Sequence, residues 1–146
     1  MSDATADVLT ANEEFYAAFE LADLDRMRAV WAGDDHGSDP ADVTICCVHP
    51  GWDALHGTSR VMRSWALIFA NTPYIQFFLS DTTVVVNGDL AVVSCAENIL
   101  TAPGEPDGDA KVVSTNVFRR VDDRWLMTLH HGSPVIRQLA EEDPDG

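Results

Sequence analysis

Apolar residues recur at steps of three and four in three parts of the chain, which is the spacing of one face of an α-helix. The three runs are Val8, Ala11, Asn12, Phe15, Phe19 and Ala22; Leu24, Met27, Val30 and Trp31; and Val61, Met62, Trp65, Ile68 and Phe69. The first predicts a helix of about five turns. The second predicts a short helix that Asp23 caps and Gly33 stops. The third predicts a helix that Thr58 or Ser59 caps and that ends before Pro73.

Runs of β-branched and apolar residues predict strands in the rest of the chain. They cover 43–48, 74–86, 90–101, 111–121 and 124–136. Asn87-Gly88-Asp89 and Asp122-Asp123 each separate two long runs, as hairpin turns do. Three helices, one strand among them and an antiparallel meander of four strands predict an α+β domain whose sheet is covered on one face by the helices.

One face of the last predicted strand changes from apolar to polar along its length. Because successive side chains of a strand point to opposite sides, one face carries Trp125, Met127, Leu129, His131 and Ser133. This row begins apolar and ends polar. It predicts a strand that passes through a core and finishes in a lined cavity.

Length and charge narrow the class of protein. The 146 residues suit one domain, 1–146, with an acidic tail at 138–146 that we expect to be disordered or helical only at its start. The acid-rich segment 34–42 predicts a solvated loop, and 102–109 a second loop. A net charge of −15 repels nucleic acids and anionic membranes, so we expect neither as partner. No apolar run approaches a membrane span and the acidic start is unlike a signal peptide, which predicts a cytoplasmic protein.

The cysteines and the known motifs predict no cofactor. Cys46, Cys47 and Cys95 are odd in number and lack zinc-site spacing, so buried thiols in a reducing compartment are expected. The sequence has no Ser-His-Asp order, phosphate-binding glycine loop or dinucleotide fingerprint. We predict neither a metal nor a cofactor.

The order of these elements and several short motifs resemble the nuclear transport factor 2-like superfamily, and within it the SnoaL-like group. The motifs are Phe15-Tyr16-Ala17-Ala18-Phe19, His49-Pro50-Gly51-Trp52, Asn87-Gly88-Asp89, and Trp125 followed by His131-Gly132-Ser133. The resemblance implies a cone-shaped α+β fold in which three N-terminal helices pack against a strongly curved, mostly antiparallel sheet. It also implies a cavity between the sheet and the first helix, and a homodimer formed through the sheet.

Ketosteroid isomerases, a branch of this superfamily, imply positions for chemistry. Their oxyanion tyrosine corresponds to Phe15, their general base to His49 and their oxyanion aspartic acid to Asn116. Phe15 cannot donate a hydrogen bond, whereas His49 can act as base or acid and Asn116 can donate through its amide. The turn position of His49 equally suits a histidine that bonds the backbone beside Pro50.

The resemblance also implies which side chains point inward. It turns the even-numbered residues of 90–101 and 111–121 toward the cavity, so that Asn98, Asn116, His49 and His131 converge there and His130 faces outward. The implied apolar walls are Phe15, Phe19, Trp52, Trp65 and Phe118. A register shifted by one would instead turn Glu97 inward as a carboxylate base. Tyr16 is expected to pack or to touch the rim, and His131 is expected to be structural or, alternatively, to line the cavity.

Two functions follow as expectations. One is a cofactor-independent isomerase, hydrolase or cyclase that transfers protons on a small apolar-to-amphipathic carbonyl compound, with His49 as base or acid and Asn116 as polariser. The other is a non-catalytic dimeric module that binds a ligand or serves in assembly.

Overall fold

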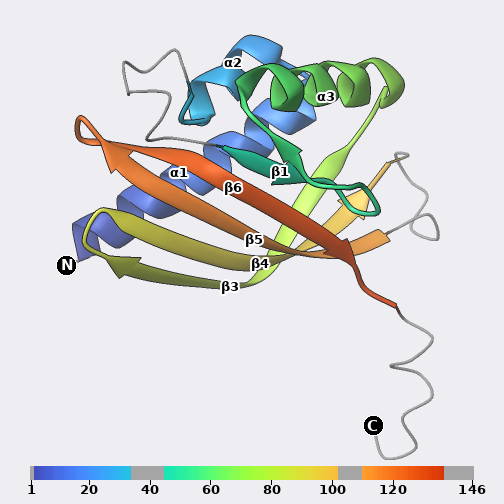
Figure 1. The fold of residues 1–146 in the computed structure, drawn as a ribbon. Coiled ribbons are helices and arrows are strands. Elements are labelled where there is room, and N and C mark those ends of the chain that lie inside the picture. The colour runs from blue at the N-terminus through green and yellow to red at the C-terminus, as the bar shows by residue number, and fades with distance from the viewer. Residues whose placement is uncertain (1, 34–44, 102–109, 137–146) are drawn as a thin grey trace, which may run out of the picture.

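Helices and strands occupy most of the 2–33, 45–101 and 110–136 ranges, which are the residues that the computed structural model describes. In chain order they are α1 Ser2–Leu21, α2 Leu24–Val30, β1 Cys46–Val48, β2 Leu55–His56, α3 Thr58–Asn71, β3 Gln76–Asn87, β4 Leu90–Leu100, β5 Ala110–Val121 and β6 Arg124–Pro134 (Figure 1). The predicted acidic loop, the 102–109 loop and the tail lie outside the described residues. Only β2 has no counterpart among the predicted elements.

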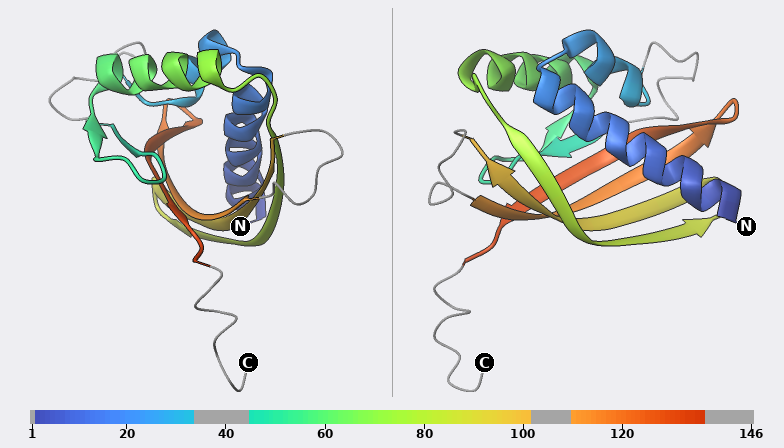
Figure 2. Two further views of the ribbon diagram at one scale, coloured as in Figure 1. Left: turned by 90° about the vertical axis from the view of Figure 1, so that its right-hand side faces the viewer. Right: turned by 180° about the vertical axis from the view of Figure 1, so that it is seen from behind.

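The described strands form one sheet in the order β2-β1-β6-β5-β4-β3. All neighbouring pairs are antiparallel except β1 and β6. The sheet curves around α1, and the three described helices all lie on its concave side, so that none of them covers the convex side (Figure 2). The predicted α+β class, with a curved and mostly antiparallel sheet, is confirmed.

The core fills the space between α1, α3 and the sheet. Phe15 lies at its centre, with its ring edge-on to Tyr16, Trp31 and Trp65 at centroid distances of 4.8, 6.5 and 5.5 Å. Phe19 packs on Trp65 and on Phe77 of β3 at 4.8 and 4.7 Å. Such edge-to-face packing adds to the stability gained by removing the rings from water.

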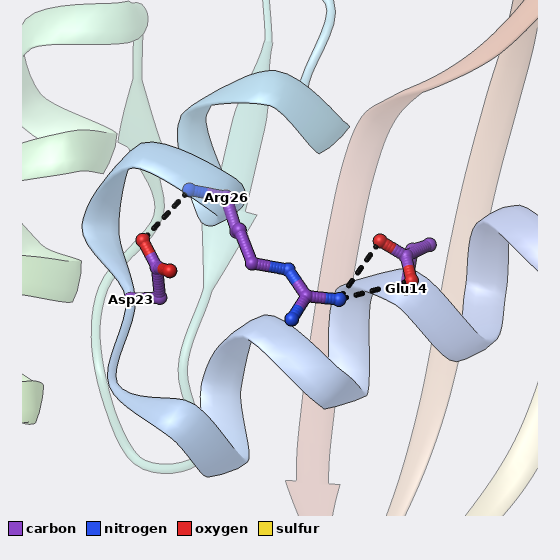
Figure 3. A network of polar contacts seen from close by, with 3 residues as sticks. All are labelled: Glu14, Asp23 and Arg26. Carbon is purple, nitrogen blue, oxygen red and sulfur yellow. Dashed lines mark hydrogen bonds and ion pairs between the residues drawn. The ribbon is translucent and has the colours of Figure 1, made fainter.

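The short helix α2 is held at both ends. The side chain of Asp23 accepts a hydrogen bond from the backbone N of Arg26, as predicted for its N-cap, and the Arg26 guanidinium pairs with Glu14 of α1 at 3.1 Å (Figure 3). The helix ends at Val30. It stops before Gly33 because the chain there pairs with β6: Trp31 forms a parallel bridge with Met127, and the N–H of Ala32 donates to the carbonyl of Met127 at 2.9 Å.

Helix α3 begins differently from the prediction. Its N-cap is Gly57 at φ +91°, and no side chain makes a capping bond, so the expected cap by Thr58 or Ser59 is wrong. Glycine suits this position because φ values in that region are strained for other residues. The predicted apolar stripe is confirmed, with Val61, Met62 and Trp65 buried.

Two register shifts decide which side chains enter the core. In β3 the register moves by one between Ser80 and Thr83, next to Asp81 at φ +54°. In the last hairpin Val117 pairs with Leu129 but Phe118 pairs with Met127, so Thr128 is an extra residue on β6. A bulge of this kind reverses the facing of every residue beyond it.

No helix among the described residues is long and apolar enough to cross a membrane.

Candidate functional site

A hollow of about 530 Å³ opens between α3 and the segment that leads from β1 to β2. We call it the Trp52 hollow, and it is lined by Trp52, Leu55, Arg60, Arg63, Ser64 and Leu67. The turn before it places Trp52, whose N–H donates to the carbonyl of His49 at 2.8 Å across Gly51 at φ +85°. The hollow has the size and the mixed apolar and polar lining of small-molecule sites.

His49 lies directly behind this hollow. Its Nε2 is 2.9 Å from the hydroxyl oxygen of Ser64, and its ring meets that of Trp52 at 4.8 Å. The Ser64 hydroxyl donates its one proton to the carbonyl of Val61 at 2.7 Å. With that proton committed, Nε2–H of His49 is the donor to Ser64, and Nδ1 is the unprotonated nitrogen.

Burial sets the charge of His49. Its side chain is only 3% exposed, and this loss of solvation lowers the pKa of His49 to about 4. The imidazole is therefore neutral at neutral pH. The sulfur of Cys47 lies 3.6 Å from Nε2 and 3.9 Å from Nδ1, and burial likewise raises the pKa of that thiol, so it stays protonated.

A second polar cluster lies inside the fold between α1 and the sheet. The Tyr16 hydroxyl donates to Oε2 of Glu97 at 2.5 Å, and the Ser114 hydroxyl donates to the same oxygen. The three side chains come from α1, β4 and β5. Burial raises the pKa of Glu97, and burial together with the nearby Glu97 raises the pKa of Tyr16 above its usual range.

Asn116 joins this cluster to His130. Its Nδ2 donates to Oδ1 of Asn12 at 2.8 Å and to the Tyr16 hydroxyl at 3.2 Å. Its Oδ1 lies 2.6 Å from Nδ1 of His130, which must be the donor. Burial, with smaller contributions from His49 and His131, lowers the pKa of His130 to about 3. Both amide hydrogens of Asn116 are thus engaged within the protein.

The aromatic residues predicted to wall a cavity fill the interior instead. Phe15, Trp65, Phe118 and Asn116 are fully buried, with 0% of their surface exposed. Side chains so enclosed do not line an open space. Trp65 lies between the His49–Ser64 pair and the buried cluster that contains His130. Its ring is 4.7 Å from the ring of His49 and 6.2 Å from that of His130. Of the predicted set, His49 and Trp52 adjoin the Trp52 hollow.

The predicted facing of β4 is wrong. Ala91, Val93, Cys95 and Glu97 are buried, whereas Val92 is 39% exposed. Asn98 lies on the outer face, where its amide donates to the carbonyl of Phe78 and to Ser80. The alternative register, with Glu97 inward, is the one found. On β5 the inward positions Ser114, Asn116 and Phe118 are as predicted.

The predicted facing of the two histidines on β6 is also wrong. His131 is exposed on the outer face opposite Thr115, and His130 is buried. The strand starts as predicted, with Trp125 and Met127 buried, and the extra residue Thr128 then reverses it. No feature of the sequence marks that bulge.

Tyr16 and the residues of the Trp52 hollow other than Trp52 itself are not assigned to a site by the sequence. Tyr16 and its neighbour Phe15 are both buried, so α1 buries two adjacent positions rather than one narrow stripe. A signal was present in Ser64, a polar residue at a buried position of the predicted third helix. No group of three or more His, Cys, Asp or Glu side chains in the described part of the chain could hold a metal ion.

The chain belongs to the SnoaL-like domain family, whose profile matches residues 8–137. A candidate dehydratase of the NTF2-like family from Streptomyces avermitilis is 46% identical and superposes with a TM-score of 0.83, covering 92% of this chain and 98% of that one. A candidate association domain of calcium/calmodulin-dependent protein kinase type II from Thiobacillus denitrificans is 31% identical, with a TM-score of 0.74 over 86% of this chain and 93% of that one.

Two further relatives have lower sequence identity to this chain. The F-box protein SKIP8 of Arabidopsis thaliana is 25% identical over 90% of this chain, but the chain spans only 51% of its length. A candidate ketosteroid isomerase from Shewanella frigidimarina, 15% identical with a TM-score of 0.67 over 85% of this chain and 92% of that one, shares the fold.

Proposed function

We propose that this protein is a cofactor-independent enzyme that transfers protons on a small, partly apolar carbonyl compound bound in the Trp52 hollow. The reaction class is isomerisation or dehydration. One observation carries the proposal: Nε2 of a neutral histidine, His49, lies 2.9 Å from the hydroxyl oxygen of Ser64, and Ser64 is one of the residues that line the hollow. A hydroxyl and an imidazole in hydrogen-bond contact can pass a proton in either direction.

The proton would move through Ser64. In the reactive tautomer Nδ1 of His49 carries the proton, and the Ser64 hydroxyl turns from the Val61 carbonyl to Nε2. Nε2 then accepts the Ser64 proton while Ser64 takes a proton from the carbon beside the substrate carbonyl. The same pair then returns that proton to another carbon in an isomerisation, or to a departing hydroxyl in a dehydration. The pKa of His49, about 4, keeps the imidazole in the form that can accept a proton at neutral pH.

Sequence similarity supports the reaction class. The Streptomyces avermitilis protein described as a candidate dehydratase is 46% identical to this chain. Asn116 does not act as the polariser that the resemblance implies, since both hydrogens of its amide are engaged by Asn12 and Tyr16.

A retained ligand gives the test. Native mass spectrometry of the purified protein identifies the small molecule that it carries, and conversion of that molecule is then followed with the wild type and with His49→Gln. We expect His49→Gln to lower turnover by roughly 10²-fold or more, the usual contribution of a general acid or base. His56→Gln makes the same chemical change at an exposed position of β2 and should leave turnover unaltered. Equal turnover in both variants would refute the proposal.

A second candidate function is assembly through the convex face of the sheet. Phe78, Val85, Leu90, Val92 and Val113 are between 39% and 64% exposed there. The outward paired positions of β3 and β4 carry no charged side chain, although the chain has 24 acidic residues. On β5 the residues opposite Leu90 and Asn98 are Arg119 and Lys111, so the face is apolar along β3 and β4 and borders basic residues on β5. An apolar surface without acidic side chains on such an acidic protein suits contact with a second copy. The 31% identity to a candidate association domain supports this function.

We also propose a cytoplasmic location for this protein. Cys46, Cys47 and Cys95 are free, as is usual in a reducing compartment.

A further inference from the structure

We propose that the Trp52 hollow selects a small organic acid, whose carboxylate is bound by Arg60 and Arg63 and whose apolar body lies against Trp52. This inference rests on the proposed function for the choice of hollow and names the class of substrate. It does not depend on the role of His49 in catalysis.

The two arginines are unpaired cations in an acidic protein. Among the described residues Arg60 and Arg63 have no hydrogen bond or ion pair, whereas Arg26 pairs with Glu14 at 3.1 Å and Arg120 pairs with Asp89 at 2.9 Å. The chain has 24 acidic side chains and only nine basic ones. The exposed Arg124 has no such partner among the described residues either, so what distinguishes Arg60 and Arg63 is that both line the same hollow.

The positions of the two arginines concentrate positive charge. They are three residues apart on α3, so their side chains are neighbours on the helix surface. Like charges at this spacing repel each other, and none of the six residues that line the hollow is acidic. A bound carboxylate would remove the repulsion and accept paired N–H donors from the planar guanidinium groups.

The remaining walls require an apolar part in the same ligand. Trp52 and Leu67 are 40% and 55% exposed, which is a large apolar surface for a soluble protein to leave beside two cations. The His49 ring, 4.8 Å from that of Trp52, supports the indole. At about 530 Å³ the hollow can hold a molecule the size of an aromatic or short-chain acid.

The chemistry of the ligand connects charge and reaction. With the carboxylate on the arginines and the apolar body on Trp52, the carbon atoms between them lie near Ser64, which lines the same hollow. The arginines, Trp52 and Ser64 together therefore select an organic acid that carries a carbonyl or hydroxyl group between its carboxylate and its apolar body.

Isothermal titration calorimetry with two matched probes tests the proposal. The probes are 3-phenylpropionate and its neutral amide, 3-phenylpropanamide, which have nearly the same shape. We expect the wild type to bind the carboxylate about tenfold or more tightly than the amide, since charge-assisted hydrogen bonds contribute on that scale. Arg60→Gln/Arg63→Gln should abolish the preference. Arg60→Lys/Arg63→Lys, which keeps the charge and loses the planar fork, should retain part of it.

Arg120→Gln is the matched control, because it removes the same charge from an exposed arginine outside the hollow. It should bind both probes as the wild type does. Circular dichroism checks that each variant is folded. Equal affinity for the two probes, no binding of the carboxylate up to about 10 mM, or an equal loss in the Arg120 variant would overturn the proposal.

The outcome separates acid recognition from catalysis. His49→Gln should keep the wild-type preference for 3-phenylpropionate over its amide, because His49 carries no charge at neutral pH and the preference comes from the two arginines. Preference for the acid with unaltered turnover in His49→Gln would leave recognition standing and refute proton transfer. Loss of turnover without preference for the acid would do the reverse.

Discussion

The hydroxyl of Tyr16 lies 2.5 Å from Oε2 of Glu97, and these two residues are 81 positions apart in the chain. Both side chains are 4% exposed. Ser114 donates to the same oxygen, so one carboxyl group satisfies two hydroxyl groups that would otherwise be buried without an acceptor. Burying a hydroxyl group without an acceptor costs free energy, so Glu97 stabilises the contact between α1 and the sheet.

Removing this acceptor should destabilise the fold. Glu97→Leu leaves the Tyr16 and Ser114 hydroxyls unpaired, at a cost of about 1–3 kcal/mol each. We expect a total loss of roughly 2–6 kcal/mol in the free energy of unfolding, measured by urea denaturation. Glu97→Gln retains a carbonyl oxygen as acceptor and should lose much less. Equal losses in the two variants would show that the hydrogen bonds are not what Glu97 contributes.

The charge of Glu97 should make stability depend on pH in a defined direction. Burial raises the pKa of Glu97 above its ordinary value of 4.5, so the folded state holds the proton more tightly than the unfolded state does. The contribution of Glu97 to stability is full below that value and is lost as the pH rises through the raised pKa. Compared with the wild type, Glu97→Gln should therefore gain stability on going from acidic to alkaline pH. A difference that stays constant with pH contradicts this.

His130 should make the protein less stable as the pH falls, which is the opposite of the effect of Glu97. Burial lowers the pKa of His130 from 6.5 to about 3, so near pH 5 the unfolded state binds a proton that the folded state does not. The stability is complete above pH 6.5 and falls as the pH drops, by about 2 kcal/mol between pH 7.5 and pH 5. In His130→Asn an amide donor takes the place of Nδ1–H toward Asn116, and this variant should lack that part of the loss. Urea denaturation at the two pH values measures the difference.

The pKa of His49 can be read without a substrate. Burial lowers the pKa of His49 to about 4, and an NMR titration of the ring protons, assigned with His49→Gln, should show it.

The same pKa should appear in the kinetics. The value of kcat/KM for the ligand recovered from the protein should stay level from about pH 7 down to about pH 5. It should fall through pH 4 as His49 becomes protonated. Titration near 6.5 would mean that the ring is solvated and not enclosed behind Ser64.

The convex face can be tested by adding one charge. If two copies pair there, light scattering should give twice the 16.0 kDa of one chain. Val92→Glu puts a carboxylate in the middle of the apolar face and should shift the protein to the monomer, whereas Val92→Thr keeps the β-branched shape and should not. A monomeric wild type, or a Val92→Glu variant that remains dimeric, would refute pairing through this face.

Local sequence determined most of the elements. The steps of three and four predicted the stripes of α1 and α3, Asp23 predicted the cap of α2, and Asn87-Gly88 predicted the β3–β4 hairpin, because each depends on contacts within a few residues. The buried Trp125 and Met127 of β6 and the inward Ser114 and Asn116 of β5 likewise match their predicted faces.

Tertiary structure alone decided what the polar residues meet. Period-two alternation cannot state which face of a strand is buried, and for β4 the packing of Glu97 against Tyr16 chose the odd-numbered face over Asn98. The extra residue at Thr128 put His130 rather than His131 inside. Such a bulge depends on how β6 fits the curved sheet beside β5, a long-range condition that periodicity along one strand does not contain. The Trp52 hollow, formed by α3 and a turn that precedes it, depends on packing in the same way.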